Sequence, residues 1–206
     1  MTDSPINRFR SNRLAKFMSM LEPGRNYRIL DIGGTLSFWK GLGGLYGLPH
    51  VTITVVNLDE AEVQDSNVQV RRGNACDLSE YRDNEFDLVH SNSVIEHVGP
   101  WEQVQKMAAE VRRLAPQYFV QTPNIGFPVE PHFRLPFVHW LPEQARISVL
   151  QAAGRIPRDP LKATPAVQRI ALLSKSQMQA LFPDAIIWPE KVLGLTKSLV
   201  AIRSAA

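Results

Sequence analysis

Histidine is the side chain best suited to move a proton near neutral pH, and this sequence contains five histidines. His132 lies in a segment punctuated by prolines, with Glu130 and Arg134 beside it. There it could deprotonate or orient an acceptor molecule if its segment folds over a pocket. The alternative interpretation of His132 is a hydrogen bond at the entry to a helix. His132 is the first candidate for a catalytic base.

A metal site is not expected from the sequence. His132 and His139 are seven residues apart, and no third ligand lies in register with them, unlike the two-histidine zinc motif on a helix. The single cysteine, Cys76, excludes an internal disulfide and a zinc cluster of thiolates, which fits a reducing compartment. We therefore predict no metal ligands.

A small-molecule site is indicated by Arg28–Thr35, an apolar run that ends in Asp31 and is followed by Gly33 and Gly34. The pattern is typical of a buried strand that leads into a tight turn, where a ligand can lie against bare backbone. The alternative role of Asp31 is to cap the backbone of that turn.

Further apolar runs predict the elements that position this turn. Strands alternate with helices, which is typical of a parallel sheet covered by helices on both faces. His50 precedes the second strand and His90 lies in the fourth, so both histidines are interpreted as structural. The predicted strands are Tyr27–Ile32, Val51–Leu58, Val68–Arg72, Phe86–Ser91 and Tyr118–Thr122; the predicted helices are Asn7–Glu22, Ser37–Leu45, Trp101–Leu114 and Ser174–Leu181; and Ala185–Trp188 with Ser198–Ile202 forms a closing hairpin.

The predicted fold class is therefore α/β: a three-layer, doubly wound, Rossmann-like sheet, mostly parallel, with a C-terminal antiparallel hairpin strand. In such sheets ligands bind at the carboxyl ends of the strands. Six residues fall at or just past these ends: Asp31, Gly33, Asn57, Asp59, Asn74 and Asn92.

Three segments show a shared pattern: Arg28–Leu36, Gly73–Leu78 and Phe86–Val98. They resemble class I S-adenosylmethionine-dependent methyltransferases. The first resembles motif I of that family, the second its Gly-Asp-Ala-x-Asp-Leu segment, and the third its fourth strand and the following helix in the type 11-like branch, whose motif ends Leu-Glu-His-Val. The resemblance implies S-adenosylmethionine as cofactor and places His97 near the mouth of the active site, which makes it the second candidate base. The cofactor-binding residues it implies are Asp31, Gly33, Gly34, Asn57, Asp59, Asn74, Ala75, Ser91 and Asn92.

Some residues depart from the pattern of that family. Thr35 and Ser37 stand where it usually has glycines, Asn57 aligns with the acidic residue that binds the ribose hydroxyls, and Asn74 replaces an aspartate at the adenine amino group. An amide can still form both kinds of hydrogen bond. The turn also lacks the three glycines that admit a pyrophosphate, which argues against a dinucleotide and for a cofactor without phosphate.

The segment Ile125–Ala171 lies outside the resemblance. We expect it to form a lid or a substrate-side wall within one methyltransferase domain that spans residues 1–206. Four apolar aromatic residues of this segment could line an apolar acceptor pocket or rest on a membrane surface: Phe127, Phe133, Phe137 and Trp140.

Composition limits the remaining choices. A net charge of +3 on 206 residues creates no strong field for nucleic acid. The first residues do not form a secretory signal, and no apolar run approaches the roughly 20 residues of a membrane-spanning helix. A cytoplasmic protein is the expectation.

The predicted function is methyl transfer from S-adenosylmethionine to a small molecule, or to a glycan or lipid intermediate. Oxygen is favoured as the methylated atom because the chain has no Asn-Pro-Pro-Tyr-like signature of amino methylation; Gln121–Asn124 does not match it. One alternative is a binding or regulatory module that kept the fold without turnover, and another, prompted by the basic N-terminal helix, is an RNA methyltransferase. Acceptor identity and oligomeric state are not encoded in a readable pattern.

Overall fold

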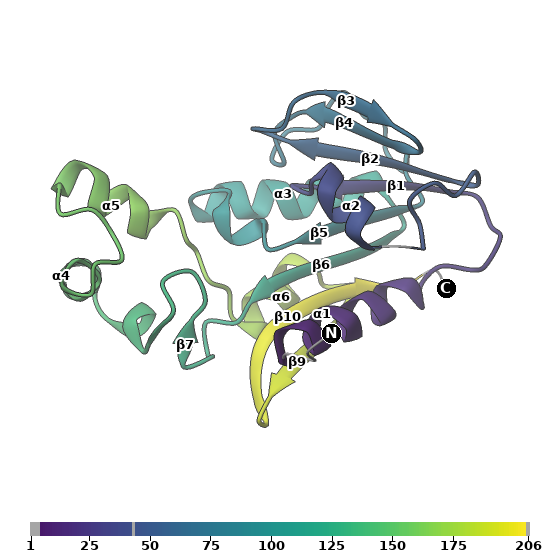
Figure 1. Cartoon of the computed structure of the whole chain (residues 1–206). Coiled ribbons are helices and arrows are strands. Elements are labelled where there is room, and N and C mark those ends of the chain that lie inside the picture. Colours follow the sequence, from purple (N-terminus) through teal and green to yellow (C-terminus); the bar gives the residue numbers. More distant parts are fainter. Residues whose placement is uncertain (1–4, 43, 205–206) are drawn as a thin grey trace.

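The computed structural model describes residues 5–42 and 44–204, and the side chains of residues 11–41 and 44–204. Its main feature is an eight-stranded sheet in the order β3-β4-β2-β1-β5-β6-β10-β9 (Figure 1). The five strands from β4 to β6 are parallel, whereas β3, at one edge, and β10, beside β6, run antiparallel to their neighbours. The strands are β1 Tyr27–Ile32, β2 Val51–Asn57, β3 Val63–Asp65, β4 Val68–Arg72, β5 Leu88–Asn92, β6 Gln117–Pro123, β9 Ile186–Val192 and β10 Leu195–Arg203.

Helices cover both faces of this sheet, as predicted. Alternate residues of β1 point to opposite faces, so that Ile29 packs with α1 (Pro5–Met18) and α2 (Leu36–Leu42), whereas Leu30 packs with α3 (Trp101–Leu114) and α6 (Lys175–Leu181). The fully buried Trp39 of α2 lies in the first of these two cores. The three-layer α/β fold predicted from the sequence is thus confirmed.

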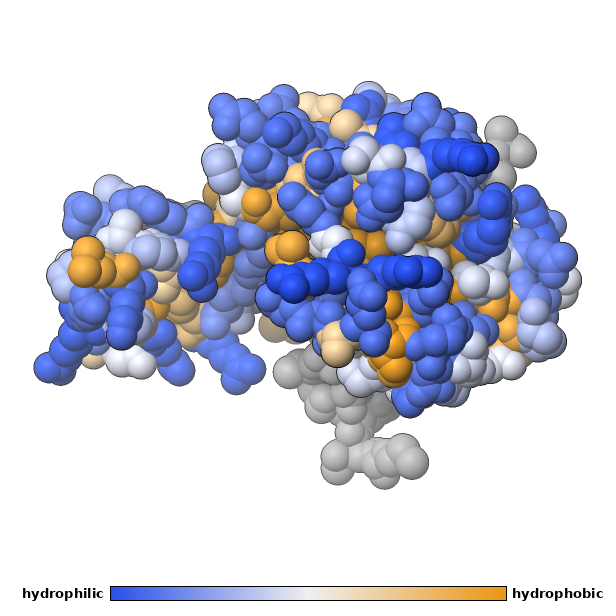
Figure 2. Space-filling view, turned by 90° about the horizontal axis from the view of Figure 1, so that it is seen from above, coloured by the Kyte–Doolittle hydropathy of each residue, from blue (hydrophilic) through white to orange (hydrophobic). Residues whose placement is uncertain are grey.

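The segment after β6 forms a lobe beside the carboxyl end of that strand (Figure 1), and Figure 2 shows the same lobe standing out from the main body. It contains β7 (Val129–Glu130), β8 (Leu135–Pro136), the short 3-10 helix η2 (Val138–Trp140), α4 (Glu143–Ala152) and α5 (Pro160–Gln168). The lobe has a hydrophobic core of its own: Val138, Ile147, Leu150, Ile156, Ala163 and Val167.

Several boundaries differ from the prediction. The first helix ends at Met18 rather than at Glu22, because the chain turns there through hydrogen bonds from Ser19 and Met20 to earlier carbonyls. The second helix begins at Leu36 rather than at Ser37. Residue 43, within the predicted range of this helix, lies outside the described residues. The same is true of residues 1–4, for which no secretory signal was expected. Strand β3 was not predicted, since its three residues are not buried and show no apolar pattern.

The helix α6 begins as expected. Ser174 accepts a hydrogen bond from the backbone N–H of Gln177, and the Gln177 side chain accepts one from the Ser174 N–H, which together form a capping box. Among the described residues, no helix is long and apolar enough to cross a membrane.

Candidate active site

The carboxyl ends of β1, β2 and β4 surround a cavity of about 240 Å³. Five of the nine residues implied as cofactor ligands line it: Gly33, Asn57, Asp59, Asn74 and Ala75. Apolar walls come from Val56, Leu58, Val94 and Val98, and His97 lies at the same cavity. We call this space the cofactor cavity. Apolar walls with a carboxylate and amides at the edge fit a nucleoside such as that of S-adenosylmethionine.

Gly33 and Gly34 are required by the backbone of the turn. Gly33 has φ +77°, and a Cβ there would lie 2.4 Å from Cγ2 of Val94. A Cβ on Gly34 would lie 1.7 Å from Oδ2 of Asp31. Any side chain at either position would displace the turn or the carboxylate beneath it.

Asp31 points into the protein and is not among the residues that line the cofactor cavity. Its Oδ2 accepts a hydrogen bond of 2.7 Å from Trp39 Nε1, and its Oδ1 lies 2.7 Å from His90 Nδ1. His90 is buried and stacks on Phe119 of β6. Asp31 therefore joins β1 to α2 and β5, and His90 is the structural residue that the sequence indicated.

The two asparagines at the cavity hold the loops that contain them. Asn57 donates to the Gly34 carbonyl at 2.8 Å and accepts from the Asp59 N–H at 3.1 Å. Asn74 accepts from the Cys76 N–H at 3.0 Å. The Asp59 carboxylate is exposed, and no hydrogen bond or ion pair from it to other described residues was found. Asp59 is therefore the freest polar group at the cavity for a ribose diol.

Thr35 has a structural role at the place of a family glycine. Its hydroxyl accepts a hydrogen bond of 3.2 Å from the Phe38 N–H, as an N-cap of α2 does. Ser37 lies 3.0 Å from it, hydroxyl to hydroxyl. The departure from glycine here thus stabilises the start of the following helix.

Ser91 and Asn92 lie on the other side of the turn. The buried Ser91 hydroxyl donates to the Ile32 carbonyl at 3.0 Å, which ties β5 to β1. Asn92 accepts a hydrogen bond from Arg13 of α1 and borders a second cavity, of about 790 Å³, between α1, α2 and the sheet. Arg13 also forms an ion pair of 2.6 Å with Glu190 of β9 and so holds α1 over this cavity. This role was not predicted, because a helical pattern does not show which of its basic residues turns inward.

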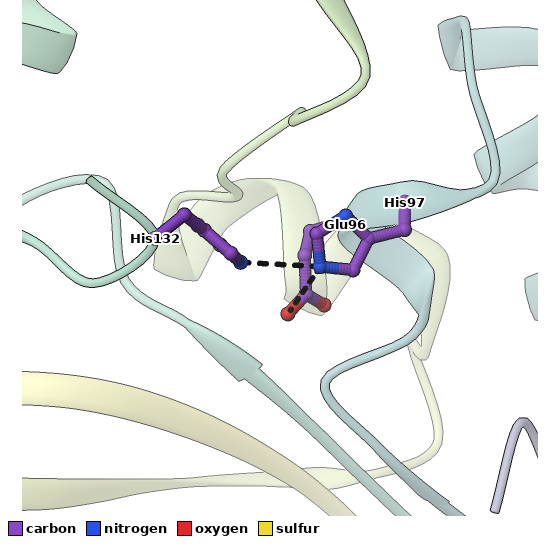
Figure 3. A group of neighbouring side chains, drawn as sticks. All are labelled: Glu96, His97 and His132. Carbon is purple, nitrogen blue, oxygen red and sulfur yellow. Dashed lines mark hydrogen bonds and ion pairs between the residues drawn. The ribbon is translucent and has the colours of Figure 1, made fainter. Parts of the chain in front are cut away.

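His132 and His97, the two candidate bases, meet although 35 positions separate them (Figure 3). Their Nε2 atoms are 3.1 Å apart. Nδ1 of His132 lies 2.6 Å from Oε1 of the buried Glu130, whose other oxygen accepts from the Phe133 N–H at 2.5 Å. His97 belongs to the short 3-10 helix η1 (Ile95–His97), where the family resemblance implied a helix after the fourth strand. The lobe therefore contributes His132 to the rim of the cofactor cavity.

Glu96 completes this group and was not predicted as a site residue. Its side chain is fully buried; Oε2 accepts from the Thr122 hydroxyl at 3.0 Å, and Oε1, 4.0 Å from His97 Nε2, has no hydrogen-bond partner among the described residues. Burial raises the pKa of Glu96 to about 7. Glu96 could have been suspected because it precedes His97 in the sequence, but the burial of its side chain could not be predicted.

The two histidines are shifted in opposite directions. Burial and the neighbouring His132 lower the pKa of His97. Burial also acts to lower the pKa of His132, but the hydrogen bond to Glu130 and the charges of Glu130 and Glu96 outweigh it, so that the pKa is raised. A proton shared by the pair is therefore held mainly by His132.

The other two histidines lie apart from this group. His139 Nε2 and Trp140 Nε1 both donate to the Ile125 carbonyl, at 2.9 and 2.7 Å. His50 is in the turn before β2, where its carbonyl accepts from the Tyr27 N–H.

Comparison with known proteins identifies the fold. A methyltransferase domain model matches residues 27–117. A search of curated proteins finds no match. Among solved structures, the chain is similar to a protein of Pyrococcus horikoshii, with a TM-score of 0.56 and 18% identity over 99% of this chain and 93% of that one.

Two further structures contain the cofactor or its product. Phosphoethanolamine N-methyltransferase 2 of Haemonchus contortus, in complex with S-adenosyl-L-methionine, gives a TM-score of 0.56 and 17% identity over 87% of this chain and 38% of that one. Magnesium protoporphyrin IX methyltransferase of Synechocystis, with bound S-adenosylhomocysteine, gives a TM-score of 0.54 and 13% identity over 96% of this chain and 83% of that one. At these identities the likeness concerns the fold. The domain match assigns residues 27–117 to a methyltransferase domain, and the solved structures agree with this assignment in fold.

Proposed function

We propose that this protein transfers the methyl group of S-adenosylmethionine to an oxygen atom of a small molecule, or of a glycan or lipid intermediate. The observation that carries the proposal is the His132–His97 pair at the rim of the cofactor cavity, with Glu130 behind it. A hydroxyl acceptor must lose a proton as it is methylated, and such a pair supplies a base at the required place.

The cofactor would lie with its nucleoside in the cofactor cavity. Gly33 would allow the backbone to approach it, Asp59 would accept hydrogen bonds from the ribose hydroxyls, and Asn74 and Ala75 would border the base. Asn92, which borders the second cavity, would lie at the methionine end, whereas the fully buried Ser91 would hold β5 against β1. When bound, the cofactor supplies a methyl carbon already activated by a sulfonium, so the protein mainly aligns the acceptor and excludes water.

Glu130 fixes His132 in the tautomer that a base needs. By accepting the Nδ1 proton it leaves the lone pair on Nε2, which faces His97 and the cavity rim. His97 lies between His132 and the cavity, so a proton taken from the acceptor by either ring can be shared across 3.1 Å. We assign His132 as the main base and His97 as its partner.

The lobe of residues 125–171 would form the substrate-side wall of the domain. Phe137 and Trp140 are 54% and 51% exposed, and their ring centroids are 5.3 Å apart. Exposed aromatic rings of this kind suit the stacking of a sugar ring or contact with a lipid chain. This supports a glycan or lipid intermediate among the acceptor classes.

His132→Ala tests the assignment. The variant should bind S-adenosylmethionine as the wild type does, because His132 is not among the residues that line the cofactor cavity, and should form S-adenosylhomocysteine about 10²–10⁴-fold more slowly. His50→Ala, outside the site, is the control and should turn over normally. Acceptors to compare are simple phenols, free sugars and lipid-linked sugars. Normal turnover by His132→Ala would refute the base assignment.

The second candidate is a module that binds the cofactor without turnover. It is favoured by Asn57, whose amide is occupied by the Gly34 carbonyl and the Asp59 N–H, so that the ribose would depend on Asp59 alone. Saturable binding of S-adenosylmethionine with no S-adenosylhomocysteine formed from any acceptor class would favour this candidate over the enzyme.

A further inference from the structure

The geometry points to a binding site for a divalent first-row transition-metal cation, such as Zn²⁺, formed by Glu96, His97 and His132. One ligand atom from each residue lies within 4.8 Å of the others (Figure 3). The expectation of no metal rested on spacing along one segment, whereas these ligands come from two segments that the fold brings together.

The two histidines are placed as metal ligands are. Their Nε2 atoms lie 3.1 Å apart. Two nitrogen ligands at about 2.0–2.1 Å from a cation, in tetrahedral or octahedral geometry, are themselves about 3–3.4 Å apart. The observed separation therefore matches that of two nitrogen ligands bound to one cation.

Glu96 provides an independent observation. Its carboxylate is fully buried, and Oε1, which has no hydrogen-bond partner in the described part of the chain, lies 4.0 Å from His97 Nε2. A buried carboxylate oxygen with no partner is costly unless a proton or a cation satisfies it. An approach of about 1 Å, which a side-chain rotation can supply, would bring it to the same cation.

His132 also has the outer hydrogen bond that holds a metal ligand in place. Glu130 accepts from Nδ1 of His132 at 2.6 Å, which leaves Nε2 free to coordinate. A carboxylate or carbonyl behind a ligating imidazole fixes its tautomer and orientation.

Two histidines and one carboxylate leave coordination positions open, as catalytic rather than structural metal sites do. Since His97 also lines the cofactor cavity, an open position would lie near an acceptor bound there. This role, though not the binding itself, rests on the proposed function. In the metal-loaded protein the cation would replace the shared proton, so the acceptor oxygen would be ionised by coordination instead of by His132.

The test is metal binding to the chelator-treated, full-length protein, measured by calorimetry with Zn²⁺ and by the visible spectrum with Co²⁺. We expect one equivalent to bind. His132→Ala and Glu96→Gln should bind at least about 10-fold more weakly, and Glu130→Gln, which keeps all three ligands, about 10-fold more weakly. His50→Ala should bind as the wild type does.

The proposal is overturned if the wild type binds no metal, or if His132→Ala and His50→Ala bind it equally. Circular dichroism checks that each variant is folded. If a variant of one metal ligand does not fold, Glu130→Gln, which keeps all three ligands, still tests the site. Turnover is assayed separately, with and without chelator. Metal binding without turnover would refute the proposed function alone, and turnover in a protein that binds no metal would refute the metal site alone.

Discussion

Replacement of Asp31 by alanine should destabilise the whole domain. The side chain is 1% exposed and holds two buried donors, Trp39 Nε1 and His90 Nδ1, each at 2.7 Å. Each donor left without a partner costs about 1–3 kcal/mol, so the free energy of unfolding should fall by about 2–6 kcal/mol. That is a large part of the about 5–15 kcal/mol by which most domains are stable.

Unfolding in urea, followed by circular dichroism, measures this loss. Asp83→Ala is the matched control, because Asp83 is 74% exposed and its ion pair with Arg113 should contribute about 0–1 kcal/mol. Asp31→Asn is the milder variant: its carbonyl keeps one bond, and His90 can change tautomer to accept from the amide. It should lose less than Asp31→Ala does.

If Asp31→Ala unfolded at the same urea concentration as Asp83→Ala, the two buried hydrogen bonds of Asp31 would not contribute to stability. Cofactor affinity adds a second readout. Because Asp31 is not among the residues that line the cofactor cavity, Asp31→Asn should bind S-adenosylmethionine in proportion to its folded fraction. A fully folded Asp31→Asn protein that no longer binds would instead place the carboxylate against the cofactor, as the family resemblance implied.

Three other changes test separate parts of the structure. Gly33→Ala should lower the free energy of unfolding by about 1–2 kcal/mol because of the φ of +77°, and further because the new Cβ clashes with Val94. Adding Val94→Ala should relieve the clash but not the cost of the backbone conformation. A double-mutant cycle of unfolding free energies separates the two effects. Ser174→Ala should cost about 1 kcal/mol through loss of the capping box, seen as a lower Tm; an unchanged Tm would contradict that role. In the folded, chelator-treated protein the pKa of Glu96 is about 7, whereas its ordinary value is 4.5. Between about pH 4.5 and 7 the folded state therefore keeps a proton that the unfolded state has lost. The free energy of unfolding should fall by about 3 kcal/mol over this pH range. Glu96→Gln should remove this fall, and an unchanged pH profile would show that Glu96 is not its source.

The main sheet could be predicted because its signals are local. The uninterrupted β-branched run at Val51 predicts a strand, although Thr52 within β2 is exposed. The apolar positions of Trp101–Leu114 recur at helical spacing on one side, and the predicted α3 has the observed bounds. The lobe was less predictable. Its core joins short apolar pieces from η2, α4 and α5, and none of them shows a strong pattern alone.

The site could be predicted only in part, for a different reason. Position after a strand indicated which residues gather at the sheet edge, and Gly33, Asn57, Asp59, Asn74 and Ala75 do line one cavity. Position does not reveal which way a side chain turns, and Asp31 turns toward Trp39 and His90. The approach of His132 to His97 depends on how the lobe folds, which no local pattern encodes.

Binding of S-adenosylmethionine in the cofactor cavity is the step on which the proposed methyl transfer depends. It is measured by calorimetric titration of the protein with S-adenosylmethionine. We expect saturable binding at one site, weakened about 10-fold or more in Asp59→Ala by loss of the charged partner of the ribose. No saturable binding at millimolar cofactor, or equal binding by Asp59→Ala, would contradict it.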